Sequence, residues 1–522
     1  MLALAAVLGL AALAAAAPTA DEITSLPGWD GPLPARMWSG YVTIGNGKKH
    51  VHYWYTEAHT SPETKPVVLW SNGGPGSSSL IGMLTELGTF QLDSRSIAAS
   101  NTSLPKLIAN PTTWAKIGNM VYFEHPTPVG FSYCDDAEAC THDDQGAADD
   151  LYACIDAFFT VKFPELQGRP FFLTGESYAG IYLPMTALVI QQKADPKVIN
   201  LQGVAHGDGC IGNEVGTCSN EGPGILAKFL HGQSFISTEL YDSIERQCVN
   251  YDAPSAVCEQ LLSQMTAEAG DYFIYMIDST CPSDHSVGGR RASQGVIKSA
   301  RDALVRDPVS GGIRLRDFVS AFNAKHATDG AGRRMWSSDM RTSDDTHTVL
   351  RNVRQRLGAS AGVAGVQAAA EAKQGTSAWY CDADGAMAAW LNDPRVQKAI
   401  HVRTDVPNFA FNYTRSEPNL LPRYSDLANA YRMLIYSGNA DGCVPTPGSE
   451  QWTAGLGFPK VDSWRPWLAN INGANQAGGF VTTYKPNNFA FATLTLSGHM
   501  APQFVGEAAY ALMDRFINNK PY

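Results

Sequence analysis

The segment 170–184, PFFLTGESYAGIYLP, joins two kinds of regular structure through a short glycine-bearing turn. Its first residues form an apolar run typical of a buried strand, and the stretch 181–192 has the pattern of a helix. Between them GESYAG, residues 175–180, resembles a Gly-x-Ser-x-Gly turn with its second glycine one residue further on. A strand, such a turn and a helix predict a nucleophile elbow, which lifts the hydroxyl of Ser177 clear of the sheet. The alternative is a glycine-serine turn without chemistry.

Short apolar runs typical of buried strands recur along the chain, and helical stretches such as 147–163 and 183–192 lie between them. Strands that alternate with helices predict an α/β fold around a mostly parallel sheet. The expected strands are 41–44, 51–55, 67–70, 120–123, 171–174, 204–206, 433–436 and 491–496.

The chain of 522 residues is long enough for one large domain with an insertion. We expect core segments at 21–209 and 379–522, separated by an insertion at 210–378 that caps the active site and whose second half is loosely structured. A separate small domain is the alternative. Basic stretches at 289–291 and 331–334 are candidate cleavage sites, which would leave two disulfide-linked chains.

The N-terminal segment 1–17 is apolar and ends in small residues, which predicts a signal peptide cleaved near residues 16–20. A membrane anchor is the alternative, but the run is marginal for a span, and no later segment reaches the roughly 18 apolar residues that a span requires. We therefore expect no membrane association after cleavage. A net charge of −11 without a basic stripe argues against nucleic acid as a partner.

Two sequons, at Asn101 and Asn412, fit a secretory route and predict glycosylation at both. Ten cysteines in a secreted chain imply disulfides. None has a C-x-x-C spacing, so we expect no metal site. These features predict a lysosomal, vacuolar or extracellular protein, and no sorting signal separates the three destinations.

A serine hydroxyl becomes a nucleophile only when a histidine takes its proton and an acid orients that histidine. In α/β-hydrolases these groups follow in the order serine, acid, histidine. Downstream of Ser177, Asp441 follows the apolar run 433–436 and His499 follows the run 491–496. Each alone could be an ordinary turn aspartate or surface histidine, but the order and the placement after strands favour a triad.

A tetrahedral intermediate needs two or more N–H donors for its oxyanion. The amide of Tyr178, next to the nucleophile, is one candidate. The second should come from a loop after an early strand, and the glycine-rich stretch 71–76 follows the strand expected at 67–70. A flexible Gly-Pro turn is the alternative.

The chain resembles the serine carboxypeptidases, an α/β-hydrolase family that includes carboxypeptidase Y and cathepsin A. The resemblance lies in WSNGGPGSSSL (70–80), NPTTWAKIGNMVYFEHPTPVGFSY (110–133), GESYAGIYLP (175–184), WLNDPRVQKAIHV (390–402), LIYSGNADGCVP (434–445) and GHMAP (498–502). It implies an α/β-hydrolase fold with an inserted cap, and hydrolysis of the C-terminal peptide bond of peptides and proteins through an acyl-enzyme, without a cofactor. The implied roles are Ser177 as nucleophile, Asp441 as acid, His499 as base, Gly74 and Tyr178 as oxyanion-hole amides, and Trp70, Asn72, Gly73 and Glu176 as the site for the substrate carboxylate.

The carboxylate site places an amide, Asn72, beside a carboxyl, Glu176. A carboxyl group can hydrogen-bond a carboxylate only when one of the two is protonated, and such a pair titrates as a unit. We therefore expect peptidase activity to be favoured at acidic pH, with less effect of pH on substrates that lack the carboxylate.

The chain departs from the family pattern at two places. Ser77 replaces a cysteine that in the family bridges to the position of Cys381, so Cys281 becomes a candidate partner for Cys381. Gly-Asp-Gly at 207–209 replaces the usual Gly-Asn-Gly, a change to which we attach no mechanistic consequence. From closeness in sequence we expect three further disulfides: Cys134–Cys140, Cys210–Cys218 and Cys248–Cys258. Cys154 and Cys443 would then remain as free thiols.

Cys443 lies two residues beyond Asp441, and its thiol either lines the site or is inert.

Three rival functions stay open: an acyltransferase that uses sugar esters, a hydroxynitrile lyase, and an inactive binding or chaperone protein. The first should alter Asn72 or Glu176, and the third should lose a triad residue; the sequence shows neither change. Substrate side-chain preference and oligomeric state are not legible.

Overall fold

The structure is a computed structural model that describes residues 17–100, 104–270, 272–279 and 383–522. Several expectations fall on residues outside these ranges. They are nearly all of the signal peptide, the sequon at Asn101, the pair Cys281–Cys381, both basic stretches and most of the second half of the insertion.

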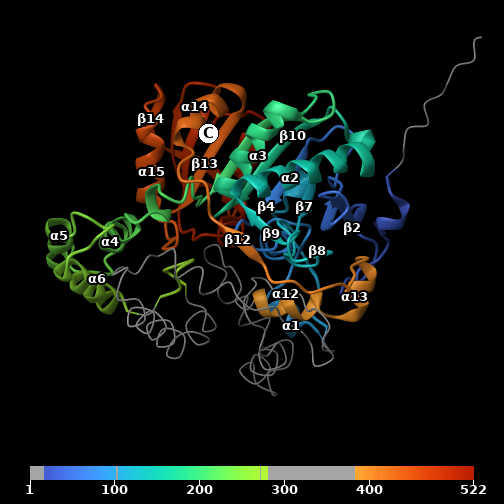
Figure 1. The fold of residues 1–522 in the computed structure, drawn as a ribbon, viewed down its shortest axis with the longest axis horizontal. Helices are drawn as coiled ribbons and strands as arrows, with labels where there is room; N and C mark the ends of the chain where they lie inside the picture. The colour runs from blue at the N-terminus through green and yellow to red at the C-terminus, as the bar shows by residue number, and fades with distance from the viewer. Residues whose placement is uncertain (1–16, 101–103, 271, 280–382) are drawn as a thin grey trace, which may run out of the picture.

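A sheet of twelve strands runs through the molecule in the order β1-β2-β3-β7-β4-β10-β11-β13-β16-β15-β14, with β8 pairing beside β3. Figure 1 shows it between β2 at one end and β14 at the other. The six strands from β7 to β16 are mutually parallel, while the pairs at both edges are antiparallel. The expected α/β-hydrolase architecture is therefore confirmed, with a parallel centre and antiparallel edges.

The main sheet consists of β1 (Glu22–Ile23), β2 (Met37–Ile44), β3 (Lys49–Thr56), β4 (Val67–Ser71), β7 (Asn119–Phe123), β8 (Tyr133–Cys134), β10 (Pro170–Glu176), β11 (Asn200–Gly207), β13 (Arg432–Gly438), β14 (Lys460–Ile471), β15 (Ala474–Tyr484) and β16 (Phe489–Leu494). Two small sheets pair β5 (Phe90–Gln91) with β6 (Ile108–Ala109) and β9 (Thr141–Asp143) with β12 (Asn412–Thr414).

The α-helices are α1 (Ser94–Ala98), α2 (Asp144–Ala157), α3 (Ala179–Lys193), α4 (Gly222–Gly232), α5 (Thr238–Gln247), α6 (Ala256–Ala269), α12 (Ala383–Leu391), α13 (Pro394–Ala399), α14 (Leu421–Ala430), α15 (Thr446–Gly455), α16 (Ala501–Phe504) and α17 (Gly506–Ile517). Single π-helical turns η2 (Gly82–Glu86) and η4 (Phe158–Lys162) and short 3₁₀ turns η1 (Thr19–Asp21), η3 (Trp114–Lys116), η5 (Pro164–Leu166) and η6 (Gly216–Cys218) complete the described elements.

The central strands are apolar along their whole length because both faces of the sheet are covered. On β4, Val67 and Leu69 pack into the core on the side of α2, α3 and α14, whereas Val68 and Trp70 pack into the core on the side of α12 and α17. Each fully buried large side chain contributes about 1.5–3 kcal/mol to folding. This double burial fixes the register of β4 and hence the start of the loop that follows it.

Several elements differ from the sequence expectations. β16 begins at Phe489 and ends at Leu494, so the expected strand 491–496 was placed two residues too far along. The long hairpin of β14 and β15 was not expected at all. The helix expected at 147–163 is α2, which begins at Asp144 and continues into the π-helical turn η4.

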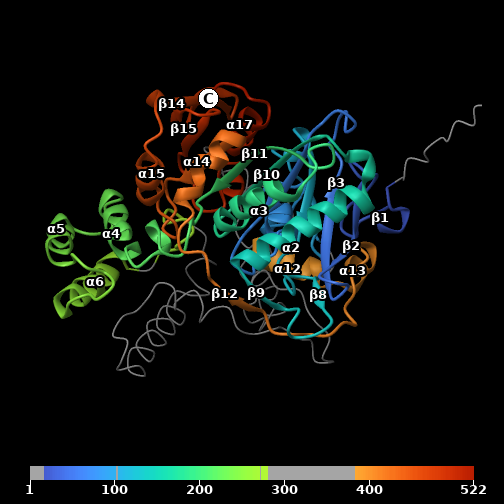
Figure 2. The same cartoon turned by 45° about the horizontal axis from the view of Figure 1, so that its top comes forward.

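The described part of the insertion carries α4, α5 and α6. In both Figure 1 and Figure 2 these three helices lie to one side of the sheet, away from α2 and α3. The segment 272–279 then returns to the loops that follow β13 and β16, where three backbone hydrogen bonds hold it. Among the described residues, no helix has the length and apolar character needed to cross a membrane.

Three disulfides form as expected from closeness in sequence, namely Cys134–Cys140, Cys210–Cys218 and Cys248–Cys258. Cys154 is a buried thiol on α2, and burial raises its pKa. A thiolate is therefore disfavoured there, so Cys154 is an inert core residue.

Candidate active site

Ser177 follows the end of β10 and precedes α3, as the elbow requires. Its φ of 61° is in the left-handed region, which costs a non-glycine residue about 1–3 kcal/mol. Backbone hydrogen bonds hold the strained residue on both sides: its N–H donates to the carbonyl of Gly207 (2.9 Å), and its carbonyl accepts from Gly180 (2.9 Å) and Cys210 (3.2 Å). The hydroxyl-bearing side chain stays partly exposed in an otherwise buried segment.

The glycine-rich loop after β4 lies directly against this elbow. Gly73 has φ +79°, and a Cβ built on it would lie 2.5 Å from the backbone nitrogen of Ala179 and 2.6 Å from that of Tyr178. No side chain can fit in that space. Glycine at 73 thus lets the loop and the start of α3 approach closely enough for their amides to face one ligand.

The backbone amides of Gly74 and Tyr178, the expected oxyanion donors, have no hydrogen-bond acceptor among the described residues. The Tyr178 ring is anchored at the elbow, because its hydroxyl donates to Asp144 (2.7 Å) and lies 3.1 Å from the side-chain oxygen of Asn213. The carboxylate of Asp144 also accepts a hydrogen bond from the hydroxyl of Tyr413 (2.7 Å). Asp144 is therefore itself held in place, and it fixes the position of Tyr178.

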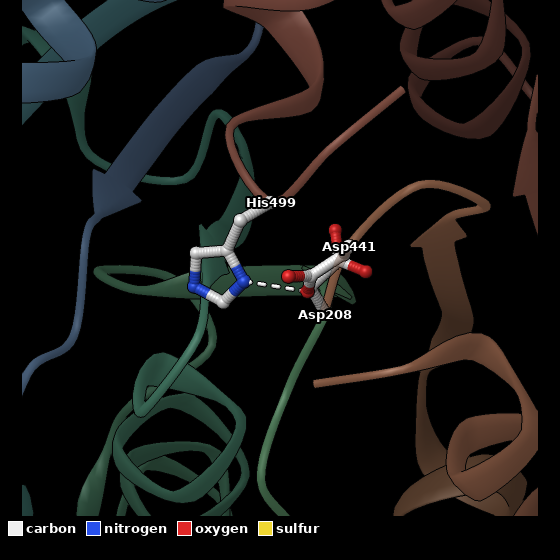
Figure 3. A group of neighbouring side chains, drawn as sticks. All are labelled: Asp208, Asp441 and His499. Carbon is white, nitrogen blue, oxygen red and sulfur yellow. Dashed lines mark hydrogen bonds and ion pairs between the residues drawn. The ribbon is translucent and has the colours of Figure 1, made fainter. Parts of the chain in front are cut away.

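Asp441 and His499 follow β13 and β16, which pair directly in the sheet. The carboxylate of Asp441 is fully buried and accepts three hydrogen bonds, from the amides of Cys443 (2.8 Å) and Val444 (3.1 Å) and from Nδ1 of His499 (2.7 Å). Figure 3 shows Nδ1 turned toward the acid and the other ring nitrogen turned away from it. That second nitrogen, Nε2, is the one left for a serine proton.

The insertion braces both of these loops through residues 272–279. The carbonyl of Ile274 accepts from the amide of Gly442 (2.8 Å), and the carbonyl of Tyr275 accepts from the amide of His499 (2.8 Å). The rings of Tyr275 and His499 also lie 5.1 Å apart between their centroids. Sequence reasoning missed Tyr275, since no motif marks it.

The expected carboxylate site is built around the side-chain amide of Asn72. Its oxygen accepts the indole N–H of Trp70 (2.8 Å) and the backbone N–H of Gly82 (3.0 Å), which fixes the orientation of the amide. Its nitrogen then donates to Oε1 of Glu176 (2.8 Å) and to Oε1 of Glu86 (3.0 Å). Trp70 is completely buried, and its indole N–H helps to orient Asn72.

Glu86 is a second acid in this site, which sequence reasoning missed. It ends the π-helical turn η2 and is completely buried, as Glu176 nearly is. Burial raises the pKa of both carboxyls well above their usual range, and the charge of Glu86 raises that of Glu176 further. The Oε2 atom of each has no hydrogen-bond partner among the described residues. The sequence signal that could have revealed Glu86 is that it is the single acid in the otherwise mostly apolar stretch 80–90.

Substitution of Gly73 by alanine should reduce kcat/KM about 10²- to 10³-fold, the effect of losing one oxyanion donor. The added methyl group would press on the Tyr178 amide, as the distances above require. Steady-state kinetics would measure this. Gly47→Ala is the matched control, because Gly47 has a similar φ of +86° and open space around it. Equal activity of the two variants would contradict the assigned position of Gly73.

Comparisons with known proteins find the same family along almost the whole chain. The family model for serine carboxypeptidases matches residues 27–519. "Serine carboxypeptidase-like 20" of Arabidopsis thaliana is 31% identical over 518 residues, covering 96% of this chain and 93% of the relative. "Lysosomal protective protein" of Mus musculus is 31% identical over 521 residues, covering 97% and 95%.

Among solved structures, a prohormone-processing carboxypeptidase from Saccharomyces cerevisiae superposes with a TM-score of 0.60 at 16% identity, covering 96% of each chain. At that identity the likeness establishes the fold, and the family follows from the sequence relatives. The chain therefore belongs to the serine carboxypeptidase family, and it is a serine carboxypeptidase of the α/β-hydrolase fold.

Proposed function

We propose that Ser177, His499 and Asp441 form the catalytic triad of this peptidase. His499 takes the proton of Ser177 through Nε2 while Asp441 holds the imidazole through Nδ1. The Ser177 oxygen attacks the carbonyl of the last peptide bond, and the amides of Gly74 and Tyr178 stabilise the oxyanion. The C-terminal residue leaves with the proton from His499, and water then hydrolyses the acyl-enzyme. The observation that carries the proposal is the 2.7 Å bond between His499 and the buried Asp441.

We further propose that Asn72, Glu176 and Glu86 admit only free chain ends. Glu176 directly precedes Ser177, so a carboxylate bound beside it lies close to the bond that is cut. The two acids share a proton, because burial opposes two negative charges around one amide. When the pair holds its shared proton, Glu176 can donate a hydrogen bond to the substrate carboxylate. Glu86 is the second acid of the pair and shares that proton with Glu176.

Asn72, Glu176 and Glu86 together form a carboxylate clamp, and this clamp sets the pH dependence of substrate binding. The raised pKa values of Glu86 and Glu176 keep the shared proton in place under acidic conditions. As pH rises through those values the proton is lost, and two buried anions face the anionic substrate. We expect KM for an N-acylated Phe-Leu to rise about tenfold per pH unit beyond that point. KM for the corresponding amide or ester, which lacks the carboxylate, should stay nearly constant.

Glu176→Gln should flatten this rise, because glutamine donates an N–H at every pH and cannot titrate. Glu57→Gln is the matched control, since Glu57 is a partly buried acid directly after β3 whose pKa is also raised by burial. Steady-state KM values across the pH range would measure the effect. Identical pH dependence of KM for the peptide and its ester would contradict the clamp.

An acyltransferase on the same scaffold is the second candidate, and an inactive binding protein is the third. The intact bond between Asn72 and Glu176 (2.8 Å) favours the peptidase over the acyltransferase. The intact pair of Asp441 and His499 favours the peptidase over the inactive binding protein. Product analysis with an added alcohol acceptor separates them. Release of free leucine from the peptide is the expected result, whereas transfer of the acyl group mainly to the alcohol would favour the acyltransferase.

We propose that the enzyme acts in the secretory pathway or its lysosomal or vacuolar branches, capped over its site by the insertion. Support comes from the three disulfides, from an exposed sequon at Asn412 and from the lysosomal relative. Mass spectrometry after enzymatic removal of N-glycans should show Asn412 converted to aspartate in protein from a eukaryotic host. An unmodified Asn412 would argue against this route.

A further inference from the structure

A second buried carboxyl lies beside the proposed triad acid. Asp208 directly follows β11, which lies next to β13 in the sheet, and its φ of 46° turns the chain at that point. It is completely buried. One oxygen of Asp208, one oxygen of Asp441 and one ring nitrogen of His499 lie within 4.8 Å of one another. Figure 3 shows both carboxyl groups on the same side of the imidazole.

The two oxygens of Asp208 have different surroundings. Oδ1 accepts from the hydroxyl of Ser437 (2.9 Å) and from the amide of Gly438 (2.9 Å). Oδ2 is buried and accepts no hydrogen bond from an N–H or O–H group of the described residues. Asp441, in contrast, accepts three bonds from N–H groups. Asp441 is therefore well solvated by the protein as an anion, and Asp208 is not.

The charges around Asp208 also oppose its ionisation. It faces Asp441 and Tyr436 from β13 and its following loop, Glu176 from the end of β10, and His499 from beyond β16. Within the described ranges, no Lys or Arg side chain forms an ion pair with Asp208, Asp441 or Glu176. Four buried carboxyls, those of Glu86, Glu176, Asp208 and Asp441, thus interact with their neighbours in one cluster, and they cannot all be ionised.

We infer that Asp208 is a protonated acid that donates a hydrogen bond from Oδ2 to Asp441 and holds that carboxylate in place for His499. This inference rests on the triad proposed above and adds a positioning residue to it. Asp208 touches neither substrate nor the reacting atoms. It acts through Asp441, whose orientation fixes the tautomer of His499.

Burial raises the pKa of Asp208 well above its usual range, and the charge of Asp441 raises it further, while the bonds from Gly438 and Ser437 oppose this. At low pH, Asp208 is neutral and the bond to Asp441 is intact. As pH rises through the raised pKa, Asp208 becomes an anion that repels Asp441. Turnover should therefore fall at alkaline pH.

Asp208→Asn provides the sharpest test, because asparagine can still donate an N–H to Asp441 but cannot titrate. The substrate is an N-acylated amino-acid ester, which lacks the carboxylate read by Glu86 and Glu176. With the full chain, we expect kcat of Asp208→Asn to stay within about tenfold of wild type at acidic pH. Its alkaline limit should move upward by about one pH unit or more. Asp208→Ala, without a donor, should lose about 10- to 100-fold in kcat at every pH.

Asp150→Asn is the matched control, since Asp150 is a partly buried acid on α2 that pairs with Lys49, and its variant should not move the alkaline limit. Two results would overturn the inference. One is an alkaline limit of Asp208→Asn that coincides with that of wild type. The other is an Asp208→Asn enzyme as impaired at acidic pH as Asp208→Ala, which would mean that a neutral donor is not what the site needs.

If Asp208→Asn fails to fold, the wild-type enzyme still decides. The rate of fluorophosphonate labelling at Ser177 should rise with pH, reach a plateau and then decline reversibly while circular dichroism shows a folded protein. The same decline should persist in Glu176→Gln. A plateau that continues until the protein unfolds would overturn the inference. Absence of any labelling at Ser177 would instead count against the triad itself, so the two failures are distinguishable.

Discussion

Ser177→Ala should reduce kcat/KM for an N-acylated Phe-Leu by about 10⁶-fold, as loss of the nucleophile does in other triads. Without the hydroxyl no acyl-enzyme can form, and His499 loses the group from which it removes a proton. The amides of Gly74 and Tyr178 should still give the residual rate above that in water. Steady-state and single-turnover kinetics would measure the loss.

The fold of the Ser177→Ala protein needs a control, because alanine at a φ of 61° is as strained as serine. Ser177→Gly serves that purpose: it removes the same hydroxyl and relieves the strain. Both variants should be equally inactive, and Ser177→Gly should unfold at the same or a higher temperature. Retention of more than about a hundredth of the activity in either variant would exclude Ser177 as the nucleophile.

Asp441→Asn should lower kcat by about 10⁴-fold, the effect of the same change in a well-studied triad. The Asp441 carboxylate accepts from two backbone amides and from Nδ1–H of His499, and each of these groups is a donor. The amide group of an asparagine would therefore face a donor whichever way it is turned. His499 would either lose its partner or adopt the wrong tautomer. Thermal unfolding should show a folded protein, so the effect is separable from stability.

Asp393→Asn is a suitable control for that substitution. Asp393 also accepts a backbone amide, that of Arg395 (2.8 Å), at the start of α13, but it belongs to no part of the proposed site. It should lose some stability and keep its turnover. An Asp441→Asn enzyme with kcat within about tenfold of wild type would mean that another acid orients His499.

The elements that position the site could be predicted from the sequence because their signals are local. Strands buried on both faces are continuous apolar runs, as at β10 and β13, and motifs at their ends mark the loops that carry Ser177 and Asp441. The edge hairpin was missed although its turn carries Asn472-Gly473, both with positive φ, a strong hairpin signal. Its strands are half exposed and do not show a continuous apolar run.

Residues that act through other residues could not be found in this way. Glu86 reaches Asn72 only because a π-helical turn ends there, and no pattern in the apolar stretch 80–90 predicts such a turn. Asp208 gains its importance from the pairing of β11 with β13, which places it beside Asp441. Both are buried acids whose partners come from distant parts of the chain. Such partnerships follow from the packing of the sheet and leave no trace in local sequence.

The most direct test of the central claim is to label the active enzyme with a fluorophosphonate and locate the adduct by tandem mass spectrometry, while following release of the C-terminal residue from an N-blocked peptide. We expect a single adduct on Ser177 and a loss of carboxypeptidase activity in proportion to labelling. An adduct on another residue, or undiminished release of the C-terminal residue from enzyme fully labelled at Ser177, would contradict the proposed site.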